Sequence, residues 1–172
     1  MSGSFDFDDV DQFLCGAVGS PGHRAFYLQT VAGSQVVTLK LEKQQVALLA
    51  DYLDRLLAVH DLPIGPAVNL GDLLQPAISE WVVGSLLVAV NEAAGRIVII
   101  AQQIADGPDE EMAEAEEGVG SAERAELRVA LTRAQVEAFI DAARELMAGG
   151  RPPCRLCGRP IDPEGHTCPR WN

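Results

Sequence analysis

The feature that most constrains the fold is a strand pattern followed at once by a helix pattern, which occurs twice in the chain. In residues 35–41 apolar and polar side chains alternate, as is typical of a half-buried strand. From about Lys43 to His60 apolar side chains recur every three or four residues, as on one face of an amphipathic helix. The same change of period occurs at residues 127–132. We therefore predict two equivalent strand-helix junctions.

A shift of 90 residues superimposes the apolar positions of these two junctions. The strand positions of the first copy, followed by those of the second, are Val37, Leu39, Leu41 and Leu127, Val129, Leu131. The helix positions are Val46, Leu49, Ala50, Leu53, Leu56, Leu57 and Val136, Phe139, Ile140, Ala143, Leu146, Met147. In the second copy Thr132 and Gln135 form a capping-box pattern, whereas Glu42 at the first helix is a poorer cap.

Two further strand patterns precede each junction. They cover residues 12–18 and 25–31 in the first unit, and residues 80–90 and 96–104 in the second. These hairpins match more loosely, with Phe13 aligned on Trp81 at an offset of 68. Residues 61–79, which hold three prolines, are expected to form a structured connection with one helical turn.

We therefore predict an α+β fold built from duplicated β-β-β-α units, with about six strands and two helices in one domain. This domain covers residues 1–150, with unit one at about 11–60 and unit two at about 80–150. The sequence does not choose between an open sheet and a closed or half-closed barrel. Residues 151–172 would form a short zinc-binding tail.

The net charge of −12 is concentrated in one segment. Residues 106–126 carry nine acidic side chains against Arg124 alone, so the rest of the chain has a charge of only −4. The part from 106 to 123 has few apolar side chains, and we expect it to be a mobile acidic loop. The body shows no basic stripe, so we do not expect it to bind nucleic acid.

No apolar run approaches the roughly 20 residues needed to span a bilayer. The N-terminus carries acidic residues where a signal peptide would carry basic ones. We therefore expect a cytoplasmic protein without a membrane partner. In a reducing compartment, closely spaced cysteines are more often metal ligands than disulfide partners.

The tail contains a pattern of metal ligands, Cys154, Cys157, His166 and Cys168. A Cys-x-x-Cys turn directs two thiolates at one ion, and the second pair can complete a tetrahedron. Three sulfurs and one imidazole suit Zn²⁺. All four positions are protein groups, which indicates a structural site without bound water. His166 is the least certain ligand, because Cys15 or Asp162 could take its place.

A second candidate site lies at the glycine-rich turn after residue 18. His23 and Arg24, together with Lys43 at the start of the first helix, could bind a small anion. The segment lacks the Lys-Ser/Thr ending of a phosphate-binding loop, and no helix follows it. A simple Pro-Gly turn between two strands is therefore the favoured interpretation, and no catalytic residue is assigned.

The sequence resembles an uncharacterised family of actinobacterial proteins of about this length, known as a conserved domain of unknown function. The resemblance rests on residues 19–28, on residues 41–46 and above all on the tail from Gly150 to Arg170. It implies a cytoplasmic bacterial protein whose tail belongs with the domain. It implies no activity or substrate.

These features favour a zinc-stabilised binding or adaptor protein, with an unknown protein or a small anionic ligand as its partner. The alternative is an enzyme that acts on a small phosphorylated or anionic substrate near His23, Arg24 and Lys43. A weaker alternative is nucleic-acid contact through the tail, with four arginines as phosphate partners. These arginines are Arg151, Arg155, Arg159 and Arg170.

Overall fold

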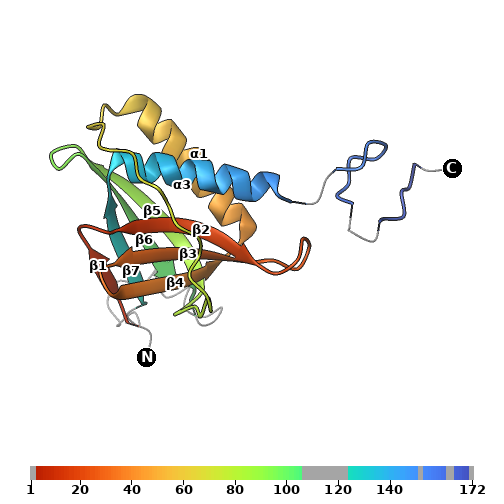
Figure 1. Ribbon diagram of the computed structural model, residues 1–172, viewed down its shortest axis with the longest axis horizontal. Coiled ribbons are helices and arrows are strands. Elements are labelled where there is room, and N and C mark those ends of the chain that lie inside the picture. The colour runs from red at the N-terminus through yellow and green to blue at the C-terminus, as the bar shows by residue number, and fades with distance from the viewer. Residues whose placement is uncertain (1–2, 106–123, 151–152, 162–164, 171–172) are drawn as a thin grey trace, which may run out of the picture.

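The computed structural model describes residues 3–105, 124–150, 153–161 and 165–170. Within these ranges the chain has seven strands in two sheets and two helices (Figure 1). The elements are β1 (Phe5–Phe7), β2 (Gln12–Val18), β3 (Ala25–Ala32), β4 (Gln35–Leu41), α1 (Lys43–Val59), β5 (Val83–Asn91), β6 (Arg96–Gln103), β7 (Glu126–Leu131) and α3 (Arg133–Ala148). The predicted α+β class with two helices is confirmed. The expected acidic loop at 106–123 lies outside the described residues.

Each helix follows three antiparallel strands that are adjacent in sequence and in space. The first sheet has the order β2-β3-β4, and α1 follows β4. In the second sheet β5, β6 and β7 are neighbours in the same way, and α3 follows β7. The two units therefore have the predicted order of elements.

Strand register shows which residues of the two units are equivalent. In the first sheet Leu41 pairs with Phe26, which pairs with Ala17. In the second sheet Leu131 pairs with Ile97, which pairs with Val90. Ala17 therefore corresponds to Val90, an offset of 73 residues. The predicted offset of 68 between these hairpins is wrong.

The residues that enter each unit pair with the last strand of the other unit. Strand β1 is parallel to β7, with Phe5 opposite Leu127. Likewise, Val82 forms a parallel bridge with Lys40 in β4, immediately before β5 begins. This bridge joins the two sheets on one side, so the arrangement is neither one open sheet nor a continuous barrel within the described residues.

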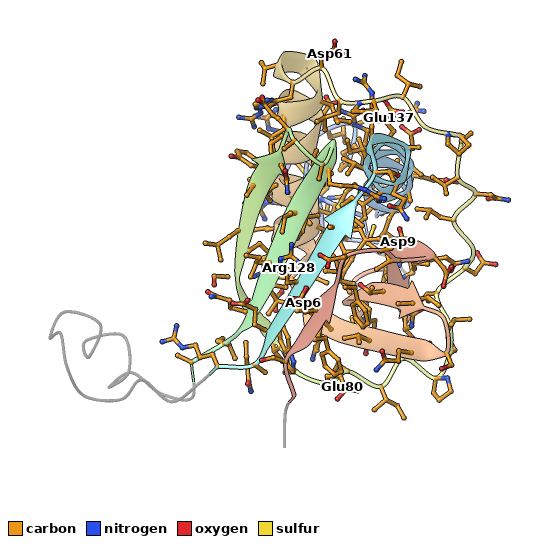
Figure 2. All side chains as sticks on the ribbon, turned by 90° about the vertical axis from the view of Figure 1, so that its left-hand side faces the viewer. Asp6, Asp9, Asp61, Glu80, Arg128 and Glu137 are labelled. Atoms are coloured by element: carbon orange, nitrogen blue, oxygen red, sulfur yellow. The ribbon has the colours of Figure 1, made fainter. Side chains whose placement is uncertain are left out.

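Strand β1 was not predicted, because the segment was interpreted only as an acidic lead-in. Its two phenylalanines pack against the core while Asp6 points outward. The Arg128 side chain on β7 donates hydrogen bonds to Asp6 (2.6 Å) and Asp8 (2.9 Å). Figure 2 shows Arg128 and Asp6 on the neighbouring strands β7 and β1. The N-terminal acidic residues are thus part of the fold.

The two helices cross one another on one side of the strands (Figure 1). They begin in the same way, each with a glutamine three residues after its N-cap. The Glu42 backbone N–H donates to Gln45 Oε1 (2.8 Å), and the Thr132 N–H donates to Gln135 Oε1 (2.9 Å). Both helices therefore have the capping interaction that the sequence indicated only for the second.

Each of these glutamines also binds a backbone carbonyl at or just before the first hairpin strand of the other unit. The Gln45 Nε2 donates to the Val83 carbonyl at the start of β5 (3.2 Å). Gln135 Nε2 donates to the Val10 carbonyl just before β2 (2.6 Å). Buried side chains of both units also form a single core cluster, which includes Phe13 and Phe139 with ring centroids 5.0 Å apart. The two units are therefore interlocked.

The connection between α1 and β5 has no helical turn, which corrects the prediction for residues 61–79. It crosses the outer face of the first sheet instead. The Leu74 N–H donates to Gln29 Oε1 (2.8 Å), and Gln29 Nε2 donates to the Leu74 carbonyl (3.2 Å). Because Gln29 is only 1% exposed, these two bonds satisfy a buried polar side chain. They also fix the position of the connection.

Candidate metal centre

The first half of the candidate metal centre is a tight turn around Cys154. The Cys154 N–H donates to the Arg159 carbonyl (2.7 Å), and the Gly158 N–H donates to the Cys154 carbonyl (2.8 Å). Gly158 has φ of +73°, a conformation that a residue without Cβ adopts without strain. The turn brings Cys157 back toward Cys154.

The second half of the centre places His166 and Cys168 against that turn. The Sγ atoms of Cys154 and Cys168 are 3.9 Å apart, and Cys157 Sγ is 3.2 Å from His166 Nε2. All four ligand atoms lie within 4.8 Å of one another. With metal–ligand bonds of about 2.0–2.3 Å, a tetrahedral zinc site would have edges of about 3.5–3.8 Å. The four residues are therefore close enough to hold a metal ion.

The surroundings of Cys154 favour its thiolate form. The backbone N–H groups of Cys157 and Leu156 donate hydrogen bonds that lower the pKa of the Cys154 thiol. The Leu156 N–H lies 3.4 Å from Cys154 Sγ. For Cys168, burial and the neighbouring thiols raise the pKa instead. A bound cation would favour both thiolates, since metal ligation requires deprotonated sulfur.

The sequence left Cys15 and Asp162 as alternatives to His166 for the fourth ligand. Cys15 lies on β2 in the core, away from this cluster, and burial raises the pKa of its thiol to about 12. Asp162 lies outside the described residues. Among the described residues, the cluster therefore contains His166 together with the three thiols.

The predicted anion-binding residues are only partly brought together. Arg24 and Lys43 line one pocket at the C-terminal end of α3. There Arg24 Nη1 donates to the Gly149 carbonyl (3.0 Å), so one guanidinium nitrogen caps the helix end. His23 is exposed in the preceding turn and does not line this pocket. An anion site at these residues stays a prediction.

Another pocket was missed by the sequence analysis. It lies between β2, α3 and residues 70–75, and its polar lining includes Arg24, Asp72 and Glu145. These residues are distant in sequence and share no motif spacing. They come together because residues 61–79 cross the sheet. The composition of that segment does not reveal this course.

Fold and cluster together define an α+β protein with seven strands in two sheets, two helices and a Cys/His cluster near its C-terminus. The chain belongs to the family described as protein of unknown function DUF3090, whose model matches residues 5–168. No curated protein and no solved structure matches the chain. Neither of the described helices is long and apolar enough to cross a membrane.

Proposed function

We propose that the four tail residues hold a structural Zn²⁺ ion and that the chain is a zinc-stabilised binding or adaptor protein of the cytoplasm. The observation that carries this proposal is the convergence of three thiols and one imidazole within 4.8 Å. This donor set is typical of structural zinc, which is held by four protein ligands. A zinc ion would contribute on the order of 10 kcal/mol to ordering so short a segment.

The side chains around the centre support a role in binding. The hydrogen bonds described for residues 153–170 all join two residues of this segment, as in the bond from Arg170 to the Leu156 carbonyl. Leu156 is 53% exposed, and Arg155 and Arg159 are exposed beside it. An apolar side chain flanked by arginines suits a protein partner that offers an apolar contact rimmed by carboxylates.

The enzyme alternative has less support. Arg24 already donates to a helix-end carbonyl, and the described Cys/His cluster has a closed set of donors. Nucleic-acid contact has some support from Arg155, Arg159 and Arg170, which are exposed, while Arg151 lies outside the described residues. A footprint of that kind normally needs a broader basic surface than the described residues provide.

A crosslinking experiment tests the binding role. A photoreactive amino acid replaces Leu156 in one sample and exposed Val36 of β4 in a control sample. We expect one partner to be captured at position 156 only, and to bind the purified zinc-loaded chain but not its Cys157→Ser variant. Equal capture at both positions, or unchanged binding by the variant, would contradict the proposal.

A further inference from the structure

The two sheets end in four edge strands, and three of these edges are protected. Strands β2 and β4 end the first sheet, and β1 and β5 end the second. Strand β1 has only three residues, one of which is the exposed Asp6, and β2 packs against α3. Strand β4 carries the exposed Lys40, whose N–H already donates to the Trp81 carbonyl (3.0 Å). Short strands, charged side chains and covering elements are means by which proteins keep sheet edges from pairing.

Strand β5 lacks these protections. It has nine residues, none of them charged and none of them proline. No described helix packs against it to the extent that α3 packs against β2. Gln45 Nε2 donates to the carbonyls of Val83 (3.2 Å) and Gly84 (3.4 Å), but from residue 85 onward the described residues offer the outer backbone groups no hydrogen bond. Every second residue of an edge strand directs its N–H and C=O groups away from the neighbouring strand, so residues 85–91 can accept another strand.

The side chains of β5 show that the core stays open at this edge. Three of them pack against the core but are only partly buried, namely Leu86, Val88 and Val90. Their partners directly opposite on β6 are fully buried, namely Ala101, Ile99 and Ile97. The two strands differ because β6 has a strand on each side, whereas β5 has one only along β6. A strand placed beside β5 would therefore remove more apolar surface from water.

The sequence of β5 is self-complementary about Val88. Two antiparallel copies can lie side by side with Val88 opposite Val88, and apolar side chains then face apolar ones while polar ones meet at both ends. The other pairs in this register are Leu86–Val90, Leu87–Ala89 and Ser85–Asn91. Apolar pairs across two strands stabilise a sheet, and in this register no like charges meet. Such self-complementarity is what an interface with twofold symmetry requires.

We propose that β5 pairs in antiparallel fashion with β5 of a second copy of the chain, so that the second sheets of two chains form one continuous sheet. The matching polarity about Val88 favours a second copy over an unrelated strand. Although the chain has a net charge of −12, neither β5 nor β6 carries a carboxylate, so the pairing brings no acidic side chains of these strands together. This interface goes beyond the proposed binding role and does not involve the metal centre.

Analytical ultracentrifugation of the full chain tests this inference directly and should show a monomer–dimer equilibrium. The double change Leu87→Lys with Ala89→Lys places lysines opposite lysines, and it should raise the dimer dissociation constant by about tenfold or more. The matched control, Leu87→Lys with Ala89→Glu, places each lysine opposite a glutamate and should retain the dimer. Both positions are exposed in the single chain, so circular dichroism should show both variants folded.

Disulfide crosslinking tests the register without relying on the charged variants. Residues directly opposite each other in an antiparallel pair have Cα atoms about 4.5–5.5 Å apart, which a disulfide can bridge. Oxidation of Val88→Cys should therefore link two chains through position 88. Leu86→Cys should not link to itself, but a mixture of Leu86→Cys and Val90→Cys chains should link. Mass spectrometry of the digested product identifies the linked positions and separates them from the native cysteines.

Three outcomes would overturn the inference. These are a chain that is monomeric at every concentration, a dimer that the double lysine change leaves unchanged, and a Val88→Cys dimer that forms no disulfide at position 88. A monomer whose β5 instead binds an extended segment of another protein would assign the edge to that protein. The dimer should persist in Cys157→Ser, so failure of the metal-centre proposal and failure of this one are distinguishable.

Discussion

Asp54 of α1 accepts a hydrogen bond from Arg144 of α3, with Oδ2 and Nη2 2.7 Å apart. The two residues are 90 positions apart, which is also the shift that relates Leu41 to Leu131 at the ends of β4 and β7. Asp54 and Arg144 are therefore equivalent positions of the two helices, and their contact lies where the two units meet. The pair therefore marks the crossing of two equivalent helices.

The Asp54–Arg144 pair should contribute little to stability but should be sensitive to charge. Both side chains are about half exposed, and such pairs are worth about 0–1 kcal/mol. Asp54→Arg should cost more than Asp54→Ala, because two arginines would then meet at the crossing. The double swap Asp54→Arg with Arg144→Asp should restore stability. Urea unfolding of the parent chain and these three variants measures this. A double swap that is no more stable than Asp54→Arg would refute the direct contact.

The two helix-start glutamines should differ in their contributions. Gln135 is 5% exposed and bonds the buried Val10 carbonyl, so Gln135→Ala should lower the free energy of unfolding by about 1–3 kcal/mol. Gln45 makes the equivalent bond to Val83 at a less buried position, and Gln45→Ala should cost about 1 kcal/mol or less. Chemical denaturation measures both variants. Equal losses of unfolding free energy would show that burial does not make the Gln135 contact stronger than the Gln45 contact.

Leu14 and Leu87 occupy equivalent strand positions but should respond differently to truncation. Leu14→Ala removes a side chain buried beside residues 70–75 and should cost about 2–5 kcal/mol. Leu87→Ala acts on a half-exposed side chain and should cost less than about 1 kcal/mol. Thermal and urea unfolding of the two variants provide the comparison. A large loss for Leu87→Ala would contradict the exposure of this side chain.

The elements that sequence predicted well are those with a regular hydrophobic period. The strand over residues 35–41 has the predicted bounds, and the second helix begins directly after Thr132, where its start was predicted. Alternation and helical spacing each specify one buried face. The Cys/His cluster was also found from sequence, since its ligands are local and their types define the chemistry. Such signals need no knowledge of distant contacts.

Sequence missed the features that depend on long-range pairing. Strand β1 has only three residues, and Arg128 stabilises it from more than 100 positions away. The offset between the hairpins could not be determined, because the match of Phe13 to Trp81 ignored register. The course of residues 61–79 depends on Gln29, a polar side chain that no local pattern marks as buried.

The Cys15 thiol should be unreactive in the folded chain. Burial raises its pKa from an ordinary value of 9.0 to about 12, so it stays protonated at pH 8 while the tail thiols of the metal-free chain react with a disulfide reagent. Because the unfolded thiol ionises more readily, its stabilising contribution is present below pH 9 and is lost as the pH rises toward 12.

Comparison with Cys15→Ala isolates this effect. Between pH 8 and pH 10 the parent chain should lose more unfolding free energy than the variant does. If the reagent modified Cys15 at pH 8 as fast as it modifies the tail thiols, the burial of the Cys15 thiol on β2 would be wrong.

Removal of one metal ligand should affect the tail and leave the body intact. His166→Ala should abolish tight metal binding, because three remaining donors leave the site open. The unfolding midpoint of the body should stay within about 2 °C of the parent, since the described bonds of the tail are internal to it. Calorimetry measures the midpoint, and Cys15→Ala is a control that should retain the metal.

The most direct test of the central claim is native mass spectrometry of the full chain after expression with zinc. The account predicts one Zn²⁺ per chain, retained by Cys15→Ala and lost from Cys154→Ser, Cys157→Ser, Cys168→Ser and His166→Ala. A chain that carries no zinc, or one whose zinc survives the loss of Cys154 and Cys157 together, would contradict it.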